Sequence, residues 1–159
     1  MEIYWNLKGV MTQMVRKMKR EDKDIFLHMT NQFYASDAVL HPIPEEYHED
    51  AFEEIMRSDV YLEGYILEMD GKPAGYAMTA KTYSHEAGGI ALWIDELFIS
   101  EQYRSRGLGT EFFSYLKAHM NPSIARVRLE VESDNHRAIR LYRRVGFTEL
   151  EYNQMYVEK

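Results

Sequence analysis

The feature that most constrains the fold is residues 94–110, which read as a buried strand, a short basic loop and the start of a helix. Residues 97–99 give the continuous apolar run of a strand, and the polar residues 101–105 interrupt it. Beyond them the apolar positions recur at helical spacing. Gly107 and Gly109 therefore lie where a strand leads directly into a helix.

This junction predicts a binding site for an anion such as phosphate. The first N–H groups of a helix lack intrahelical partners, and the helix dipole adds a partial positive charge. Glycines let a phosphate approach the backbone, and Arg104 and Arg106 add full charges. The loop is neither a P-loop, which ends in Gly-Lys-Ser/Thr, nor a three-glycine dinucleotide motif. Taken alone, it fits an ordinary strand–helix turn equally well.

A second informative stretch is the helix that follows Asn135 and ends in a glycine and an aromatic residue. Its apolar positions Ala138, Leu141, Tyr142 and Val145 follow the spacing i, i+3, i+4, i+7. One face of the helix is therefore apolar, and it turns Tyr142 inward.

Together the two stretches resemble the GCN5-related N-acetyltransferase (GNAT) superfamily. The first matches its pyrophosphate loop, Arg/Gln-x-x-Gly-x-Gly/Ala, and the second its Asn-x-x-Ala-x-x-Leu-Tyr…Gly-Phe helix. The resemblance is clear from about Ile90 to Phe147 and looser from Val15 to Gly89. It implies an α/β (α+β) acyl-CoA N-acyltransferase fold. In that fold a mixed central β-sheet, flanked by about four helices, splays at the acetyl-CoA site.

The remaining pattern predicts the elements in the order β-α-α-β-β-β-α-β-α-β. Strands are expected at residues 15–18, 61–69, 74–83, in the central stretch ending at 99, at 127–131, and as one or two strands within 149–158. Helices are expected at residues 25–35, 45–58, from 108 onward, and at 135–144. Asp70-Gly71 predicts a hairpin turn. Residues 1–13 lack periodicity and are interpreted as a flexible N-terminal extension, followed by a single domain at 14–159.

Composition excludes several classes of protein. The 159 residues contain no cysteine, so a thiol nucleophile, a zinc–thiolate site and a disulfide framework are excluded. The six histidines are scattered without metal-ligand spacing, so no metal site is expected. No apolar run has membrane-spanning length and no signal peptide is evident, so a cytoplasmic protein without a membrane partner is expected.

The charge distribution favours a small cationic substrate over nucleic acid. The formal net charge is −7, which disfavours a nucleic-acid partner. Residues 101–147 contain nine Lys/Arg and five Asp/Glu, whereas the rest of the chain contains ten and twenty-one. A basic half and an acidic half suit an anionic cofactor and a cationic substrate; solvated charge spread unevenly over the surface is the alternative.

The resemblance implies how acetyl-CoA (coenzyme A) binds. The backbone of Leu97, Phe98 and Ile99 would pair with the pantetheine arm, and the N–H groups of the loop would hold the pyrophosphate. A backbone amide near Leu97 or Phe98 would stabilise the oxyanion. The cofactor-binding residues so implied are Leu97, Phe98, Ile99, Arg104, Ser105, Arg106, Gly107, Leu108, Gly109, Thr110, Asn135, Ala138 and Tyr142.

The catalytic candidates are Asp95, Glu96 and Tyr142. An alkyl ammonium has a pKa near ~10, so a carboxylate must take its proton. Asp95 and Glu96 resemble the paired acidic dipeptide of polyamine acetyltransferases, and strand alternation places them on opposite faces, so only one can serve. A salt bridge is the alternative role for each. By resemblance Tyr142 is the general acid, the alternative being a core tyrosine. Asn135 would cap its helix or fix acetyl-CoA.

The resulting hypothesis is an N-acetyltransferase that transfers acetyl from acetyl-CoA to a primary amine in a ternary complex. A small cationic amine, such as a polyamine or an amino-acid derivative, is favoured. The acidic helix at 45–58 presents Glu46, Glu49, Asp50 and Glu53 on one face, which is either solvated or borders the acceptor cleft. The alternatives are a non-catalytic acyl-CoA-binding regulatory module and a protein or peptide N-terminal acetyltransferase. Monomer and homodimer both stay open.

Overall fold

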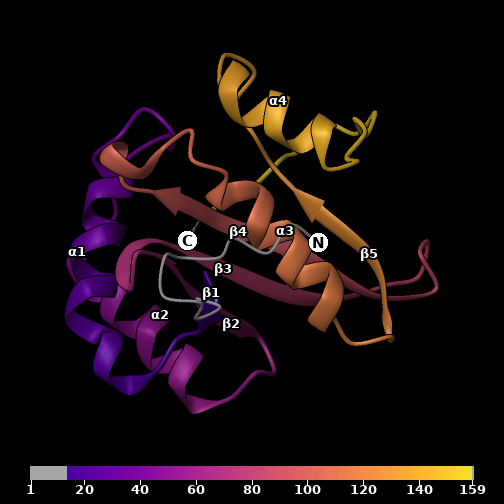
Figure 1. Ribbon diagram of the computed structural model, residues 1–159. Coiled ribbons are helices and arrows are strands. Elements are labelled where there is room, and N and C mark those ends of the chain that lie inside the picture. The colour runs from indigo at the N-terminus through magenta and orange to yellow at the C-terminus, as the bar shows by residue number, and fades with distance from the viewer. Residues whose placement is uncertain (1–13, 159) are drawn as a thin grey trace.

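A mixed β-sheet of five strands forms the centre of the protein (Figure 1). The coordinates are a computed structural model that describes residues 14–158, so the proposed extension at 1–13 lies outside the described residues. The strands are β1 (Val15–Lys17), β2 (Leu62–Met69), β3 (Lys72–Ser84), β4 (Gly89–Ile99) and β5 (Ile124–Leu129). They lie side by side in chain order; the first four are antiparallel, and β5 runs parallel to β4.

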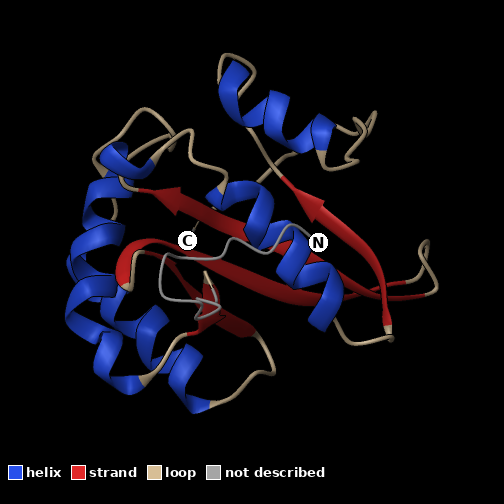
Figure 2. Cartoon of the chain, in the orientation of Figure 1, coloured by secondary structure: helices blue, strands red, loops and turns tan. Residues whose placement is uncertain are grey.

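Helices cover both faces of the sheet (Figure 2). They are α1 (Lys23–Tyr34), α2 (Glu45–Arg57), α3 (Leu108–His119) and α4 (His136–Arg144), with short 3-10 turns η1 (Arg20–Asp22) and η2 (Glu101–Tyr103). On one face α1 and α2 bury Phe26 and Phe52 against Tyr76 of β3. On the other face α3 buries Phe112 against Tyr65 of β2. The expected fold class, a mixed sheet with four helices, is confirmed.

The sheet splays between β4 and β5. Their parallel pairing begins at Ile90 opposite Ile124 and ends at Ile94 opposite Leu129. Beyond that point β4 continues to Ile99 with β3 on one side only. The expected opening beside the central strand is therefore present.

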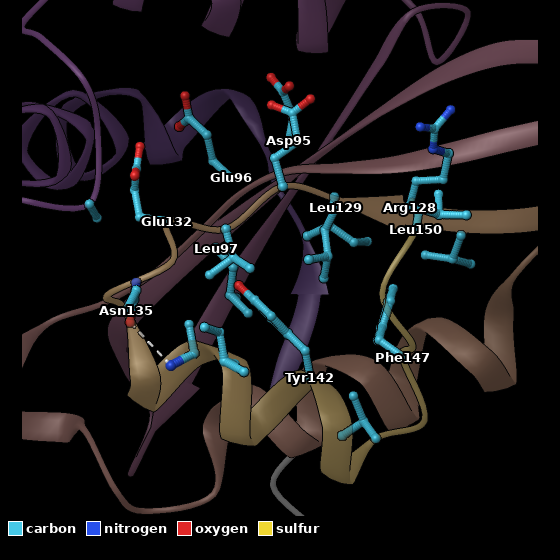
Figure 3. Close-up of a pocket in the computed structure, with 18 of the residues that line it drawn as sticks. Asp95, Glu96, Leu97, Arg128, Leu129, Glu132, Asn135, Tyr142, Phe147 and Leu150 are labelled. Carbon is cyan, nitrogen blue, oxygen red and sulfur yellow. Dashed lines mark hydrogen bonds between the residues drawn. The ribbon is translucent and has the colours of Figure 1, made fainter. Parts of the chain in front are cut away.

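A β-bulge marks the point where the sheet opens. Ile94 lies opposite Thr79 and Glu96 lies opposite Met78, so Asp95 has no partner on β3. The extra residue resets the alternation of side chains. Asp95 and Glu96 therefore point to the same side of β4 (Figure 3), and both line one cleft. The expectation that they occupy opposite faces was wrong, because it assumed an unbroken strand.

The strands expected within 149–158 are also absent from the described residues, and that prediction was wrong. Leu150, Tyr152, Met155, Tyr156 and Val157 are all exposed, and residues 149–158 pair with no described strand. Alternating apolar residues need a partner edge to form a strand, and the β5 ladder has already ended. Among the described helices, none has both the length and the apolar character required to cross a bilayer.

Candidate active site

The diverging ends of β4 and β5 open into a cleft of about 1750 Å³. The end of α1, the loop that follows it, and α4 complete its walls. Six of the predicted site residues line it, namely Asp95, Glu96, Leu97, Asn135, Ala138 and Tyr142. The predicted pyrophosphate loop lies outside this cleft, at the N-terminus of α3, as described below.

At the end of β4, the backbone N–H and C=O groups of every second residue point into the opening. The N–H of Ser100 donates to the carbonyl of Ala74 at 2.9 Å, which fixes the hydrogen-bonding phase of the β3–β4 pair. Phe98 then bonds to β3, whereas Leu97 and Ile99 direct their N–H and C=O groups away from it. Of the two amides considered as oxyanion donors, only that of Leu97 therefore points into the opening.

The N-terminus of α3 has the geometry of an anion site. Gly107 is its N-cap, with φ +89°, and an added Cβ there would meet nothing within 4 Å. Glu111 is the first helical residue with a backbone bond to this turn, its N–H donating to the Gly107 carbonyl at 3.0 Å. The N–H groups of Leu108, Gly109 and Thr110 thus have no intrahelical partner. This turn therefore has the free N–H groups that the predicted phosphate site requires, and phosphate binding here stays a prediction.

The second glycine of the motif has a different role from the one expected. A Cβ on Gly109 would lie 2.6 Å from Cδ2 of Leu141. Gly109 is buried and lets α4 pack on the start of α3. The expectation that both glycines clear a path for phosphate is corrected: the open position is Gly107.

The two loop arginines are placed differently. Arg104 donates from Nε to the carbonyl of Ile99 at 2.9 Å, which ties the loop back to the end of β4. The exposed side chain of Arg106 makes no hydrogen bond or ion pair with any residue in 14–158. Arg106 is therefore the loop cation that can meet a phosphate directly.

Two arginines of α4 also reach this loop, and sequence reasoning missed them. Arg137 donates to Oγ of Ser105 at 3.2 Å, and Arg144 donates to Oγ1 of Thr110 at 3.3 Å. They lie seven residues apart, so they share the helix face that packs on α3. The seven-residue spacing of the two arginines, with the apolar Leu141 between them, was the sequence signal that could have placed both next to the loop.

Glu96 is buried and held by two tyrosines. The residue is only 6% exposed. Its Oε1 accepts a hydrogen bond from the hydroxyl of Tyr34 and its Oε2 accepts one from the hydroxyl of Tyr76, each at 2.6 Å. Burial raises the pKa of the Glu96 carboxyl, and the two hydroxyls oppose this shift. Asp95 is more exposed, and its pKa is raised by partial loss of hydration and by the charge of Glu130.

Tyr142 faces the carboxylates across the opening (Figure 3). Its ring packs edge-on against Phe113 and Phe147 at centroid distances of 5.9 Å, and its hydroxyl points toward Leu97. That hydroxyl forms no hydrogen bond with any described residue, and burial raises its pKa. The tyrosine is thus both a packing residue and a protonated group directed at the opening.

Asn135 caps α4. Its Oδ1 accepts a hydrogen bond from the N–H of Ala138 at 3.1 Å, as the N-cap reading of the sequence expected. The amide nitrogen of the Asn135 side chain is not used by this cap, and the residue lines the cleft. The cap fixes the start of the helix that carries Tyr142.

The acidic side chains in the cleft come from β4 and from the segments that follow β5 and α4, and not from α2. Glu130 and Glu132 follow the end of β5 and line the cleft with Asp95, and these three make no ion pair within the described part of the chain. Sequence reasoning missed Glu130 and Glu132. The residues of the acidic α2 face are not among the cleft residues, and Glu49 and Glu53 pair with cations outside the cleft. The acidic face of α2 therefore lies outside this cleft, which agrees with the solvated-face option.

Separated parallel strands, an open helix N-terminus and a tyrosine facing carboxylates are the features that the sequence resemblance to acyl-CoA N-acyltransferases leads one to expect. The chain belongs to the acetyltransferase (GNAT) family, whose sequence profile matches residues 24–147.

Known relatives and structures agree with this assignment. The spermine/spermidine N(1)-acetyltransferase of Bacillus subtilis is 33% identical over 94 residues, which cover 55% of this chain and only 62% of that protein's length. Two solved structures share the fold: a "possible acetyltransferase" from Clostridium difficile 630 (TM-score 0.78, 20% identity, 91% of this chain and 96% of that one) and aminoglycoside N-acetyltransferase AAC(6')-Iy with CoA (TM-score 0.75, 18% identity, 91% and 93%). At these identities the structures support the fold alone.

Proposed function

We propose that this N-acetyltransferase acts on the primary amine of a small cationic acceptor, with a polyamine as the favoured class. The observation that carries the proposal is the set of cleft carboxylates Asp95, Glu130 and Glu132, which have no cationic partner among residues 14–158. Carboxylates that lack an internal cation can bind an external one. The name of the Bacillus subtilis relative supports the same class of acceptor.

The donor acetyl-CoA fits the groups around the opening. The Leu97 and Ile99 backbone can pair with the amide-containing pantetheine arm as a further strand would. The open turn at Gly107, the free N–H groups after it and the cation of Arg106 suit the pyrophosphate. Bound acetyl-CoA supplies the activated acetyl group, and the protein orients it.

We assign the proton transfers to two side chains. Glu96 accepts a proton from the ammonium, directly or through water, which leaves a neutral amine whose nitrogen bonds to the thioester carbonyl carbon. The N–H of Leu97 stabilises the negative charge that develops on the carbonyl oxygen. As the C–S bond breaks, Tyr142 donates its proton to the sulfur. The second proton lost by the nitrogen restores the Tyr142 hydroxyl. Glu96 then gives its proton to solvent, so one proton is released per turnover.

The experiment is a CoA-release assay on spermidine, lysine derivatives, aminoglycosides and peptides. We expect turnover with spermidine, a large loss of kcat in Glu96→Gln, and a raised KM with smaller loss of kcat in Asp95→Asn. The exposed Asp59→Asn removes the same charge far from the cleft and serves as the control. Acetyl-CoA binding without CoA release for any amine would instead support a regulatory module.

A further inference from the structure

Glu96 receives hydrogen bonds from two elements that are distant in the sequence. Tyr34 ends α1, 62 residues before Glu96, and Tyr76 lies on β3, 20 residues before it. Both bonds are 2.6 Å long and each tyrosine takes a different carboxylate oxygen. A single carboxylate is thus held at both oxygens inside the α1–α2 side of the core.

The tyrosines are themselves fixed by buried neighbours. Tyr76 is fully buried, and the hydroxyl of the buried Thr30 lies beside its own. Oγ1 of Thr30 is 3.1 Å from Nδ1 of the buried His48 on α2, and the ring of Tyr34 packs against that imidazole at 5.1 Å. Because each tyrosine has one hydroxyl proton and donates it to Glu96, the Tyr76 oxygen is free to accept from Thr30. Thr30 and His48 share one hydrogen bond, and the imidazole tautomer sets which of the two donates it.

We propose that Tyr34 and Tyr76 are positioning residues that hold Glu96 in one orientation and keep it ionised until it accepts the proton of the acceptor ammonium. This inference rests on the proposed function, in which Glu96 is the proton acceptor. In the step, an N–H bond of the ammonium breaks and an O–H bond forms on Glu96. A carboxylate oxygen has two lone pairs, so each can accept a tyrosine bond and still face the cleft.

The surroundings of Glu96 oppose its ionisation, which is why the hydroxyls matter. Burial raises the pKa of Glu96, and the neighbouring carboxylate of Asp95 raises it further. The same cleft is lined by Glu130, whose charge raises the pKa of Asp95, and by the neutral Tyr142. Its basic side chains, none of which is a cause of the shift in the Glu96 pKa, are His41, Lys117, Arg126, Arg128, His136 and Arg143. Behind the tyrosines lies His48, whose own pKa burial lowers, so it is not a fixed cation. The hydrogen bonds from Tyr34 and Tyr76 are therefore the interactions that favour the charged form of Glu96.

The variants Tyr34→Phe and Tyr76→Phe each remove one of these bonds and keep the ring. We expect the pKa of Glu96 to rise by about one pH unit in each, the effect of losing one hydrogen bond to a charged group. The acid limb of kcat/KM should move to higher pH by the same amount. Near the alkaline plateau the rate should recover, because Glu96 is ionised there. Tyr65→Phe is the matched control, since Tyr65 is buried like Tyr76 but lies on the opposite sheet face.

Two readouts keep the result decisive. Carbon-13 NMR of glutamate-labelled protein, assigned with Glu96→Gln, follows the carboxyl without requiring turnover, and the pH profile follows the reaction. Shifts in both tyrosine variants and none in Tyr65→Phe support the inference. An unchanged Glu96 titration, or an equal loss of rate at every pH, overturns it. If the Tyr76→Phe variant does not fold, the Tyr34→Phe variant alone tests the inference, because Tyr34 is only half-buried. A wild type that titrates as expected but acetylates no amine refutes the proposed function and leaves the tyrosine contacts intact.

Discussion

Leu141 of α4 fills the space beside the α-carbon of Gly109 in α3, where an added Cβ would lie 2.6 Å from Cδ2 of Leu141. This contact determines how closely α4 approaches the start of α3. Because α4 carries Tyr142 and begins at the capping Asn135, the position of the proposed acid depends on a glycine that lies outside the cleft.

The first prediction concerns that contact. Cδ2 is the end of a flexible side chain, so Gly109→Ala can be accommodated by rotation of Leu141. Gly109→Val adds two methyl groups more than alanine and should cost about 1–3 kcal/mol of stability by overpacking, with a lower kcat. Urea unfolding and turnover measure both effects. Adding Leu141→Ala should relieve the valine variant, with a coupling energy of about 0.5–3 kcal/mol; strictly additive effects would show that the residues do not meet.

The second prediction concerns the open glycine of the loop. Gly107→Glu places a negative charge at the helix N-terminus and should weaken acetyl-CoA binding by roughly tenfold or more. Gly88→Glu is a matched control, because Gly88 also has positive φ, +71°, and open space around it. Isothermal titration calorimetry measures both affinities. Equal affinities in the two variants would remove the loop from the donor site.

Tyr142→Phe is expected to separate catalysis from binding. The ring contacts with Phe113 and Phe147 are kept, so the stability and the affinity for acetyl-CoA should change little. Loss of a positioned acid should lower kcat by about 10²–10⁴. Tyr115→Phe, on the half-buried side of α3, controls for removal of a hydroxyl. Wild-type kcat in the Tyr142 variant would leave that residue a packing role only.

The acceptor prediction compares two acidic surfaces. In Glu130→Gln/Glu132→Gln, the KM for spermidine should rise and depend less on salt, since unit charges act over a Debye length of ~10 Å at 0.1 M. The same charge removal on α2, in Glu46→Gln/Asp50→Asn, should leave KM unchanged, because these residues do not line the cleft. Initial rates at two salt concentrations test this. Equal effects of the two pairs would indicate a long-range field and no local subsite.

The sequence predicted most of the fold because its strongest signals are local. The strand–loop–helix stretch and the Asn135 helix have fixed spacings, and the structure places Gly107 at a helix N-cap and Asn135 at another. The hairpin at Asp70-Gly71 is similarly local, and both residues adopt positive φ. The strands expected within 149–158 failed because strand formation depends on a partner that periodicity does not reveal.

The parts of the site that escaped prediction depend on long-range packing. Tyr34 and Tyr76 reach Glu96 only because α1 packs across β3 and β4, and nothing in their local pattern distinguishes them from other core tyrosines. Glu130 and Glu132 continue the polar alternation of β5 beyond its last paired residue, so they resembled surface positions. A bulge has no clear sequence signature, which concealed the shared side of Asp95 and Glu96.

The bulge affects how freely the residue at position 95 can be substituted. With position 95 deleted, Ile94 would still face α3 and Glu96 would still face the tyrosines, since regular alternation alone gives that order. The apolar packing on the two faces of the sheet therefore does not depend on which side chain is present at position 95. An inserted residue of this kind can change identity, and with it the acceptors that the cleft admits, while the core on either side stays the same.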